Sequence, residues 1–179
     1  MRLKSSRLLI ISLLLLPACA AKPALIREKD SFTGESIIRT VGNTLPRENH
    51  AATVSLDARY LQPENGVGRY EFWVTVRNPR VCIEITPGES LFLFIDGKQK
   101  NYSSNVGSAP NQSFTKSPEA LACTEYAVYQ GIPRADLQDI VQAKSAQIKI
   151  ASRHGDITAT LTEPNLKAIA SVVNPSTGK

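Results

Sequence analysis

The chain has 179 residues, with 21 lysines and arginines against 16 aspartates and glutamates, and a formal net charge of +5. Setting aside three basic residues that precede an N-terminal apolar run leaves 18 against 16, so the rest of the chain is nearly neutral. Its basic residues are scattered singly among acids, which excludes the basic face or stripe of a nucleic-acid-binding protein. The length beyond that run suits one domain with a substantial core.

The N-terminal segment has the order typical of a bacterial lipoprotein signal peptide. Three basic residues within residues 1–7 precede the apolar residues 8–16, a run too short to span the roughly 30 Å of a bilayer core. The bacterial lipobox then requires Leu three residues before a cysteine and a small residue just before it, as Leu16 and Ala18 provide. We expect residues 1–18 to be cleaved and Cys19 to become the lipid attachment site.

An ordinary secretory signal, cut at the A-x-A-like site Ala18-Cys19-Ala20, is the alternative interpretation of the same segment. Either interpretation predicts export. Ala20, rather than Asp, at the second mature position fits the usual signal for transfer to the outer membrane of enteric bacteria. We therefore expect a protein of the bacterial cell envelope, facing the periplasm from the inner leaflet of that membrane.

The three cysteines support this location. Acylation of Cys19 leaves Cys82 and Cys123, and an oxidising compartment favours a disulfide between them. A redox-active thiol pair is the less favoured alternative, because the chain has no C-x-x-C motif. A zinc site is weaker still, since His50 and His154 lack the paired spacing of zinc ligands.

The residues that follow, 19–50, have mixed charge and few apolar residues in any period, so we expect a flexible tether there. Two local features leave alternatives open. Residues 24–29 fit a short helix, and residues 37–41 fit a strand that could add an edge to the domain.

From Val54 onward the apolar period is two, which is typical of strands with one face in a core. Residues 91–95 are apolar on both faces and should form a central strand. Asp96-Gly97 is a strong hairpin signal after it. The strands that we expect cover residues 54–60, 70–76, 81–85, 91–95, 98–102, 123–132, 148–150 and 157–161.

The rest of the chain is expected to form one long loop and two helices. Residues 103–118 are rich in Ser, Asn, Gly and Pro, which predicts a surface loop that could serve for binding. Pro133 opens a segment with helical spacing, and we expect this helix to cap the core. Thr162 fits the N-cap of a second helix.

Short strands separated by turns, with two short helices, predict an all-β fold: an antiparallel immunoglobulin-like β-sandwich over residues 51–179. Cys82 and Cys123 would then lie in or beside strands that face each other across the core. The Cys…Trp…Cys order of true immunoglobulin domains is absent, because Trp73 precedes both cysteines. The expected likeness is therefore architectural.

The sequence contains none of the common nucleophile, metal or phosphate-binding motifs, so we expect no enzyme and no cofactor or metal site. His154 beside Asp156 suggests a base with its orienting acid, but Gly155 makes this a hairpin turn. Glu84 and Glu89 flank a Pro-Gly turn, where exposed acids are common. His50 is expected to be solvated at the end of the tether.

Trp73 lies on the face of its strand opposite Phe72 and Val74. We expect a helix or the tether to cover it and make it part of the core. If that face is exposed instead, the tryptophan could anchor a ligand, a sugar or a protein partner.

Two stretches carry a resemblance to a known family: R-Y-E-F-W-V-T-V-R-N-P-R at residues 69–80 and A-L-A-C-T-E-Y at residues 120–126. With the lipobox, they resemble the YajI-like lipoproteins of enteric bacteria over the whole length. The resemblance implies a lipid-anchored envelope protein with an immunoglobulin-like sandwich. It supplies no catalytic residues.

We therefore expect a binding or structural module, held at the membrane by its lipid and open to an envelope protein partner. Two alternatives remain open: a carrier of a small apolar ligand between the sheets, and an enzyme whose site no motif reveals. The interior of the sandwich and the surroundings of Trp73 and His154 distinguish these three hypotheses.

Overall fold

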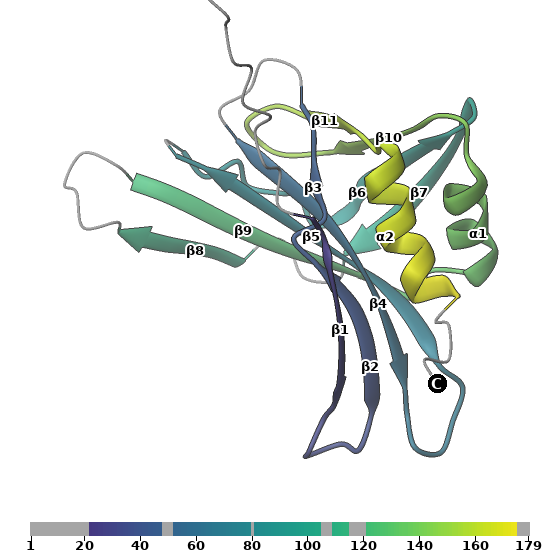
Figure 1. Cartoon of the computed structure of the whole chain (residues 1–179). Coiled ribbons are helices and arrows are strands. Elements are labelled where there is room, and N and C mark those ends of the chain that lie inside the picture. The colour runs from purple at the N-terminus through teal and green to yellow at the C-terminus, as the bar shows by residue number, and fades with distance from the viewer. Residues whose placement is uncertain (1–21, 48–51, 80, 105–108, 115–120, 175–179) are drawn as a thin grey trace, which may run out of the picture.

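Two antiparallel sheets and two helices build the domain (Figure 1). The computed structural model describes residues 22–47, 52–79, 81–104, 109–114 and 121–174. The predicted signal peptide, Cys19 and His50 lie outside the described residues. Within those residues, no helix is long and apolar enough to cross a membrane.

The larger sheet has seven strands in the order β1-β2-β4-β5-β9-β8, with the short β3 also paired to β4. Its centre is the long pair β4 and β5, where the period-two pattern of the sequence is strongest. The strand bounds are β1 Ala24–Lys29, β2 Ser36–Val41, β3 Thr44–Leu45, β4 Thr53–Gln62, β5 Arg69–Asn78, β8 Ala109–Phe114 and β9 Leu121–Gln130.

The smaller sheet has four strands in the order β11-β10-β6-β7. β6 is a central strand as predicted, because it pairs with both β10 and β7. The bounds are β6 Gly88–Ile95, β7 Lys98–Ser104, β10 Ala146–Ile150 and β11 Ile157–Thr160.

Both predicted helices are present: α1 spans Arg134–Gln142 and α2 spans Glu163–Val173. Thr162 is the N-cap of α2, and its backbone N–H donates to Oδ1 of Asn165 at 2.9 Å. This bond gives one otherwise unpaired N–H at the helix start an acceptor. α2 packs beside α1 and over β4 (Figure 1).

One hydrophobic core lies between the two sheets and the helices. Leu56 and Phe72 enter it from the larger sheet, Leu91 and Ile148 from the smaller sheet, and Leu137 from α1, each fully buried. The predicted all-β sandwich is therefore confirmed. The immunoglobulin-like arrangement stays a prediction.

The expected flexible tether over residues 19–50 is wrong for residues 24–45, which form β1, β2 and β3. The open question about residues 37–41 is resolved in favour of a strand, since Ile37 and Ile38 pair with Leu61 and Tyr60 of β4. The short helix considered for residues 24–29 is not formed. The residues of β1 favour a helix by local propensity, but they form a strand paired with β2. Tertiary pairing overrides a weak helix propensity. The domain therefore begins well before residue 51.

The expected surface loop over residues 103–118 is also wrong in part. Residues 109–114 form β8, which pairs along β9 from Ala109–Tyr126 to Phe114–Leu121. The composition misled because β8 is an edge strand, where polar residues and Pro110 are tolerated.

The predicted Asp96-Gly97 hairpin joins β6 to β7, and both residues have positive φ, 47° and 80°. This is the backbone that a tight two-residue hairpin requires. Oδ1 of Asp96 accepts the backbone N–H groups of Lys144 and Ser145 at 3.0 and 2.9 Å. These bonds lower the pKa of Asp96 below its usual 3.8 and tie the hairpin to the start of β10.

We predict that Asp96→Asn lowers the melting temperature at neutral pH, because asparagine tolerates positive φ but lacks the charged acceptor. A carboxylate whose pKa is lowered by folding stabilises the protein above its unfolded pKa and loses that contribution as pH falls. The difference from wild type, measured by circular dichroism, should therefore be full at pH 7 and shrink below about pH 4. A difference that stays constant down to about pH 3 would contradict this account.

Candidate functional site

Trp73 lies on the outer face of the larger sheet and not in the core, contrary to expectation. Phe72 and Val74 beside it are fully buried in the core, so the residue between them must face the other way. The segment expected to cover this face adds strands to the sheet instead. The tryptophan is left half-buried on an open sheet face.

A polar cluster of Arg59, Glu71 and Arg69 lies at the indole: Arg59 and Glu71 contact it, and Arg69 lies next to Glu71. The guanidinium carbon of Arg59 lies 4.8 Å from the centroid of the Trp73 ring, within the range of a cation–π contact. The indole N–H of Trp73 donates to Oε2 of Glu71 at 3.2 Å. Glu71 is only 3% exposed, although it lies on the outer face.

This cluster is incompletely satisfied. The nearest contacts of Arg59 and Arg69 to Glu71 are 3.9 and 3.7 Å, too long for hydrogen bonds. Nε of Arg59 is buried and has no hydrogen-bond partner within the described structure. A buried donor without an acceptor costs folding free energy, so its retention calls for an explanation.

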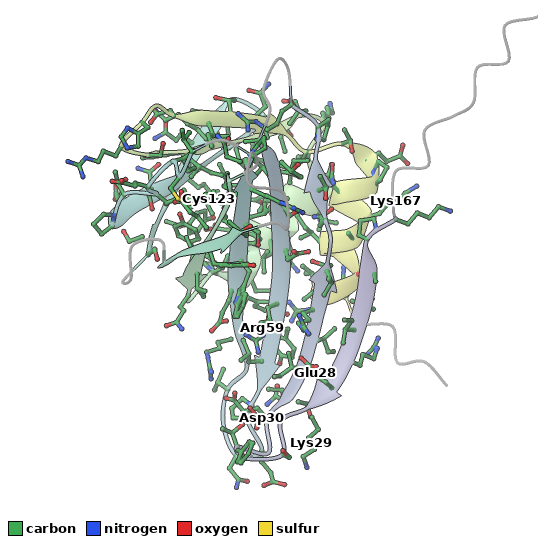
Figure 2. The ribbon with its side chains drawn as sticks, turned by 90° about the vertical axis from the view of Figure 1, so that its left-hand side faces the viewer. Glu28, Lys29, Asp30, Arg59, Cys123 and Lys167 are labelled. Carbon is green, nitrogen blue, oxygen red and sulfur yellow. A yellow bond between two sulfur atoms is a disulfide. The ribbon has the colours of Figure 1, made fainter. Side chains whose placement is uncertain are left out.

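Two hollows meet at this cluster, and Arg59, Trp73 and Tyr126 line both of them. The main hollow, of about 980 Å³, lies between outward residues of β4, β5 and β9 and the end of β7, and its lining includes Asn101 and Gln130. The side hollow, of about 420 Å³, extends toward β1 and β2. Figure 2 shows Arg59 and Glu28, which belong to the lining of the side hollow, on the long strands of the sheet.

Asp57 is a half-buried acid in the lining of the side hollow. It accepts hydrogen bonds from the Thr40 hydroxyl and the Asn43 backbone N–H, both at 3.1 Å. Burial nevertheless raises the pKa of Asp57 above its usual value, although these bonds oppose the shift. Asp57 thus holds the segment at Thr40 and Asn43 against β4 and has a structural role in the lining of the side hollow.

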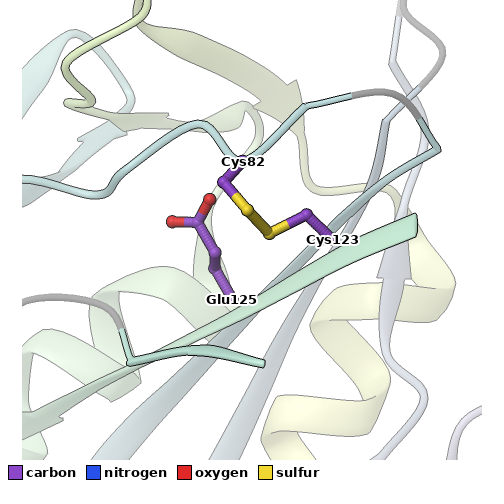
Figure 3. A group of neighbouring side chains, drawn as sticks. All are labelled: Cys82, Cys123 and Glu125. Carbon is purple, nitrogen blue, oxygen red and sulfur yellow. A yellow bond between two sulfur atoms is a disulfide. The ribbon is translucent and has the colours of Figure 1, made fainter. Parts of the chain in front are cut away.

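The second notable site is the predicted disulfide between Cys82 and Cys123, which is confirmed, with Cα atoms 5.1 Å apart (Figure 3). Asn78 pairs with Cys123 and Glu71 pairs with Gln130, so the disulfide and the main hollow lie at opposite ends of the β5–β9 pair. The disulfide therefore has no direct part in the hollow.

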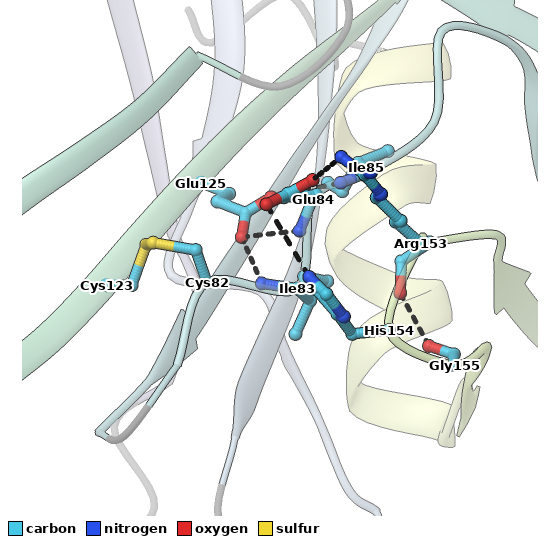
Figure 4. Close-up of polar contacts among 10 residues, drawn as sticks. Cys82, Ile83, Glu84, Ile85, Cys123, Glu125, Arg153, His154 and Gly155 are labelled. Carbon is cyan, nitrogen blue, oxygen red and sulfur yellow. Dashed lines mark hydrogen bonds and ion pairs between the residues drawn. A yellow bond between two sulfur atoms is a disulfide. The ribbon is translucent and has the colours of Figure 1, made fainter.

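Glu125, two residues from the disulfide on β9, is 1% exposed and binds three consecutive backbone N–H groups (Figure 4). Its Oε1 accepts from Ile83 and, at 2.9 Å, from Glu84; its Oε2 accepts from Ile85 at 3.0 Å. Glu84 has a φ of 55°, and this left-handed residue lets successive N–H groups converge on one anion.

The predicted strand at residues 81–85 is therefore wrong. Its N–H groups bind a carboxylate instead of a neighbouring strand, and only Ile85 forms an isolated bridge, with Ser152. On the other side, the backbone N–H of Arg153 donates to the Glu84 carbonyl at 2.9 Å. This segment is the crossover from β5 in the larger sheet to β6 in the smaller sheet, and it is held from both sides.

Cys82, Cys123 and Glu125 are the group of potential metal ligands that the described residues bring together, within 4.8 Å of one another. The two sulfur atoms are bonded to each other and the carboxylate is filled by N–H donors. The group therefore fits a structural role better than a metal site. We call the disulfide and the Glu125 carboxylate, which together hold residues 82–85 against β9, the clasp.

The pairing of His154 with Asp156, which the sequence suggested and which we set aside in favour of a turn, is not formed. His154 lies 3.5 Å from Glu84, while Asp156 pairs with Lys149 at 2.9 Å. Arg153 lowers the pKa of Glu84, which is the wrong direction for a general acid at neutral pH. His154 and Glu84 are about half exposed and belong to the lining of neither hollow.

Sequence reasoning did not identify Arg59, Glu71 or Glu125. The only signal for these three residues in the sequence was a charged residue within a predicted strand. Ordinary solvent-exposed residues of strands give the same signal. Cys82, Cys123 and Trp73 were identified because their residue types are rare in this chain.

Comparison of the chain with protein-family models, with curated proteins and with solved structures found no match. The function has to be inferred from the chain's own residues.

We predict that Glu125→Gln lowers the free energy of unfolding by roughly 3 kcal/mol, because the amide NH₂ cannot accept the Ile85 N–H and buried donors lose their partner. Urea denaturation under oxidising conditions measures the loss. Glu64→Gln, at an exposed acid, is the matched control and should change little. Equal effects of the two substitutions would contradict the clasp.

Proposed function

We propose that this chain is a lipid-anchored protein of the bacterial cell envelope whose sandwich acts as a binding module. Cys19 carries the lipid in the inner leaflet of the outer membrane, and the domain faces the periplasm. The binding surface is the outer face of the larger sheet at Trp73. The observation that carries the proposal is the unsatisfied Arg59–Glu71–Trp73 cluster between two hollows.

The composition of this surface supports binding. Trp, Tyr and Arg are the residues most enriched among those that dominate binding energy at interfaces, and here Arg59, Trp73 and Tyr126 lie together. Tyr126 is 43% exposed, although a large aromatic ring favours burial. A ligand that covers the cluster would supply the partner that Arg59 lacks.

The anchor is supported by the lipobox and accords with the disulfide, since exported proteins meet an oxidising compartment. The resemblance to YajI-like lipoproteins belongs to the same proposal. Because β1 begins at Ala24, only five residue steps separate it from Cys19, at most about 18 Å of extended chain. The domain would therefore stay close to the lipid surface.

The two alternative functions gain no specific support. A carrier needs space between the sheets, where the core residues are at most 9% exposed. An enzyme needs a concave site around its titratable groups, and His154 lies with Glu84 on an exposed turn.

Metabolic labelling tests the anchor. We predict that palmitate labels the wild-type chain in bacteria and does not label Cys19→Ser, because the thioether-linked and amide-linked lipids require that cysteine. Expression of both chains is followed by immunoblotting as the control. Acylation that survives the substitution would overturn the lipoprotein proposal.

Site-specific photo-crosslinking in living cells tests the surface. A photoreactive phenylalanine analogue in place of Tyr126 should give adducts that the same analogue in place of Phe32, which is 98% exposed on the β1–β2 turn, does not give. The adducts of the Tyr126 variant should weaken when Arg59→Met is added. Identical patterns from the two positions would refute binding at this face.

A further inference from the structure

The main hollow contains both a hydrogen-bond acceptor and a hydrogen-bond donor that are not fully used within the protein. Among the described residues, Glu71 accepts one side-chain hydrogen bond, from Trp73, although an ionised carboxylate has about four acceptor sites. Arg59 offers its Nε–H donor, which lacks an acceptor within the described structure. A hydroxyl group both accepts from a guanidinium and donates to a carboxylate, so a polyhydroxylated ligand matches this pair.

The hold on Arg59 is weak, which allows it to move. Its side chain is 19% exposed, and within the described residues it makes a cation–π contact to Trp73 and a 3.9 Å contact to Glu71. Turning the guanidinium aside would uncover the face of the indole. The same motion would free the buried Nε to donate to a ligand.

Aromatic rings line the hollow beside these polar groups. Trp73 and the exposed Tyr126 lie on neighbouring strands, where Thr75 pairs with Tyr126 and Trp73 pairs with Val128. A pyranose ring has an apolar C–H face that packs on an aromatic ring while its hydroxyl groups bond to planar polar side chains.

The charge of the lining points to a neutral ligand. The lining carries two arginines, Arg59 and Arg69, and two acids, Glu71 and Asp136. Arg69 also pairs with Glu35 at 2.9 Å, and Asp136 also pairs with Lys100, so positive and negative groups stay balanced around the hollow. Asn101, Ser103 and Gln130 add neutral groups that both donate and accept. A buried carboxylate disfavours an acidic ligand, and the volume of about 980 Å³ leaves room for several sugar units.

We infer that the main hollow is a carbohydrate-binding site for a neutral oligosaccharide, with Tyr126 and Trp73 as stacking rings and Glu71 and Arg59 as the hydroxyl-binding pair. This inference rests on the proposed binding function and names its ligand class. Two envelope sources share this chemistry: chains of N-acetylated amino sugars and chains of plain hexoses.

The chain contains a single tryptophan, so emission excited beyond the tyrosine absorption band reports on Trp73, which lines both hollows. The Glu71 variant below separates the two, because Glu71 belongs to the lining of the main hollow and not of the side hollow. The full chain in detergent is titrated with chitotetraose, which represents the amino-sugar source, and with maltotetraose, which represents the hexose source. We expect a saturable change of Trp73 emission with one of them below about 10 mM, and the responding sugar identifies the source.

Two variants test the residues. Tyr126→Ala should weaken binding about tenfold or more while leaving the melting temperature nearly unchanged, because Tyr126 is exposed. Glu71→Gln should also weaken binding, because it removes a charged acceptor. If Glu71→Gln fails to fold, the result for Tyr126→Ala decides the test. Phe32→Ala is the control, because it removes an exposed aromatic ring that lines neither hollow, and it should bind as wild type.

No saturable change with either sugar, or equal affinity of wild type and Tyr126→Ala, would overturn the inference. The proposed function has a separate readout. If the crosslinks at position 126 persist and contain a protein partner while both sugars fail, the face binds a protein and the carbohydrate assignment is wrong. If the crosslinks also vanish, both proposals fail.

Discussion

The crossover between the two sheets is the constraint on which the rest of the structure depends. Residues 82–86 leave the larger sheet after β5 and must reach β6, a central strand of the smaller sheet. The disulfide and the buried carboxylate of Glu125 tie this segment to β9, and backbone hydrogen bonds tie it to the turn at Arg153. In the chain-entropy model, closing a loop of this length stabilises a fold by about 4 kcal/mol, and the three N–H bonds fix the geometry that the disulfide alone would leave loose.

Because the smaller sheet is fixed against the inner face of the larger sheet, only the outer face of the larger sheet is left to carry a binding site. The helices and the smaller sheet fill the inner face of the larger sheet, and β1 and β2 lengthen that sheet without folding over it. The described residues therefore leave the outer face open at its centre, where outward residues of β4, β5 and β9 meet. Arg59, Glu71 and Trp73 are held there by long, regular strand pairing, while their own polar contacts are incomplete. A rigid scaffold with an unsatisfied polar cluster is the arrangement that a binding site requires.

Local pattern predicted much of the fold. The period of two located β4, β5 and β9, and an apolar run located β6. Helical spacing with Pro133 and Thr162 located both helices, and Asp96-Gly97 located a hairpin. The prediction failed at β1, β8 and the crossover. β1 has helix-favouring residues and β8 has loop-like residues, and each is a strand because a partner strand lies beside it. The crossover has a strand-like sequence, but the positive φ of Glu84 turns its N–H groups toward a carboxylate 40 to 42 residues away, which binds them.

By itself, the sequence determined an all-β fold with two helices, the disulfide partners and the expectation of an exported, lipid-anchored chain, because these depend on short-range patterns and on rare residue types. Only the tertiary structure decided that Trp73 faces outward, that Glu125 is a buried clasp, and that Arg59 and Glu71 meet at a hollow. The physical reason is that the alternation along one strand shows which residues share a face, but not what covers that face. Covering is decided by segments distant in sequence, and here those segments leave the face with Trp73 open.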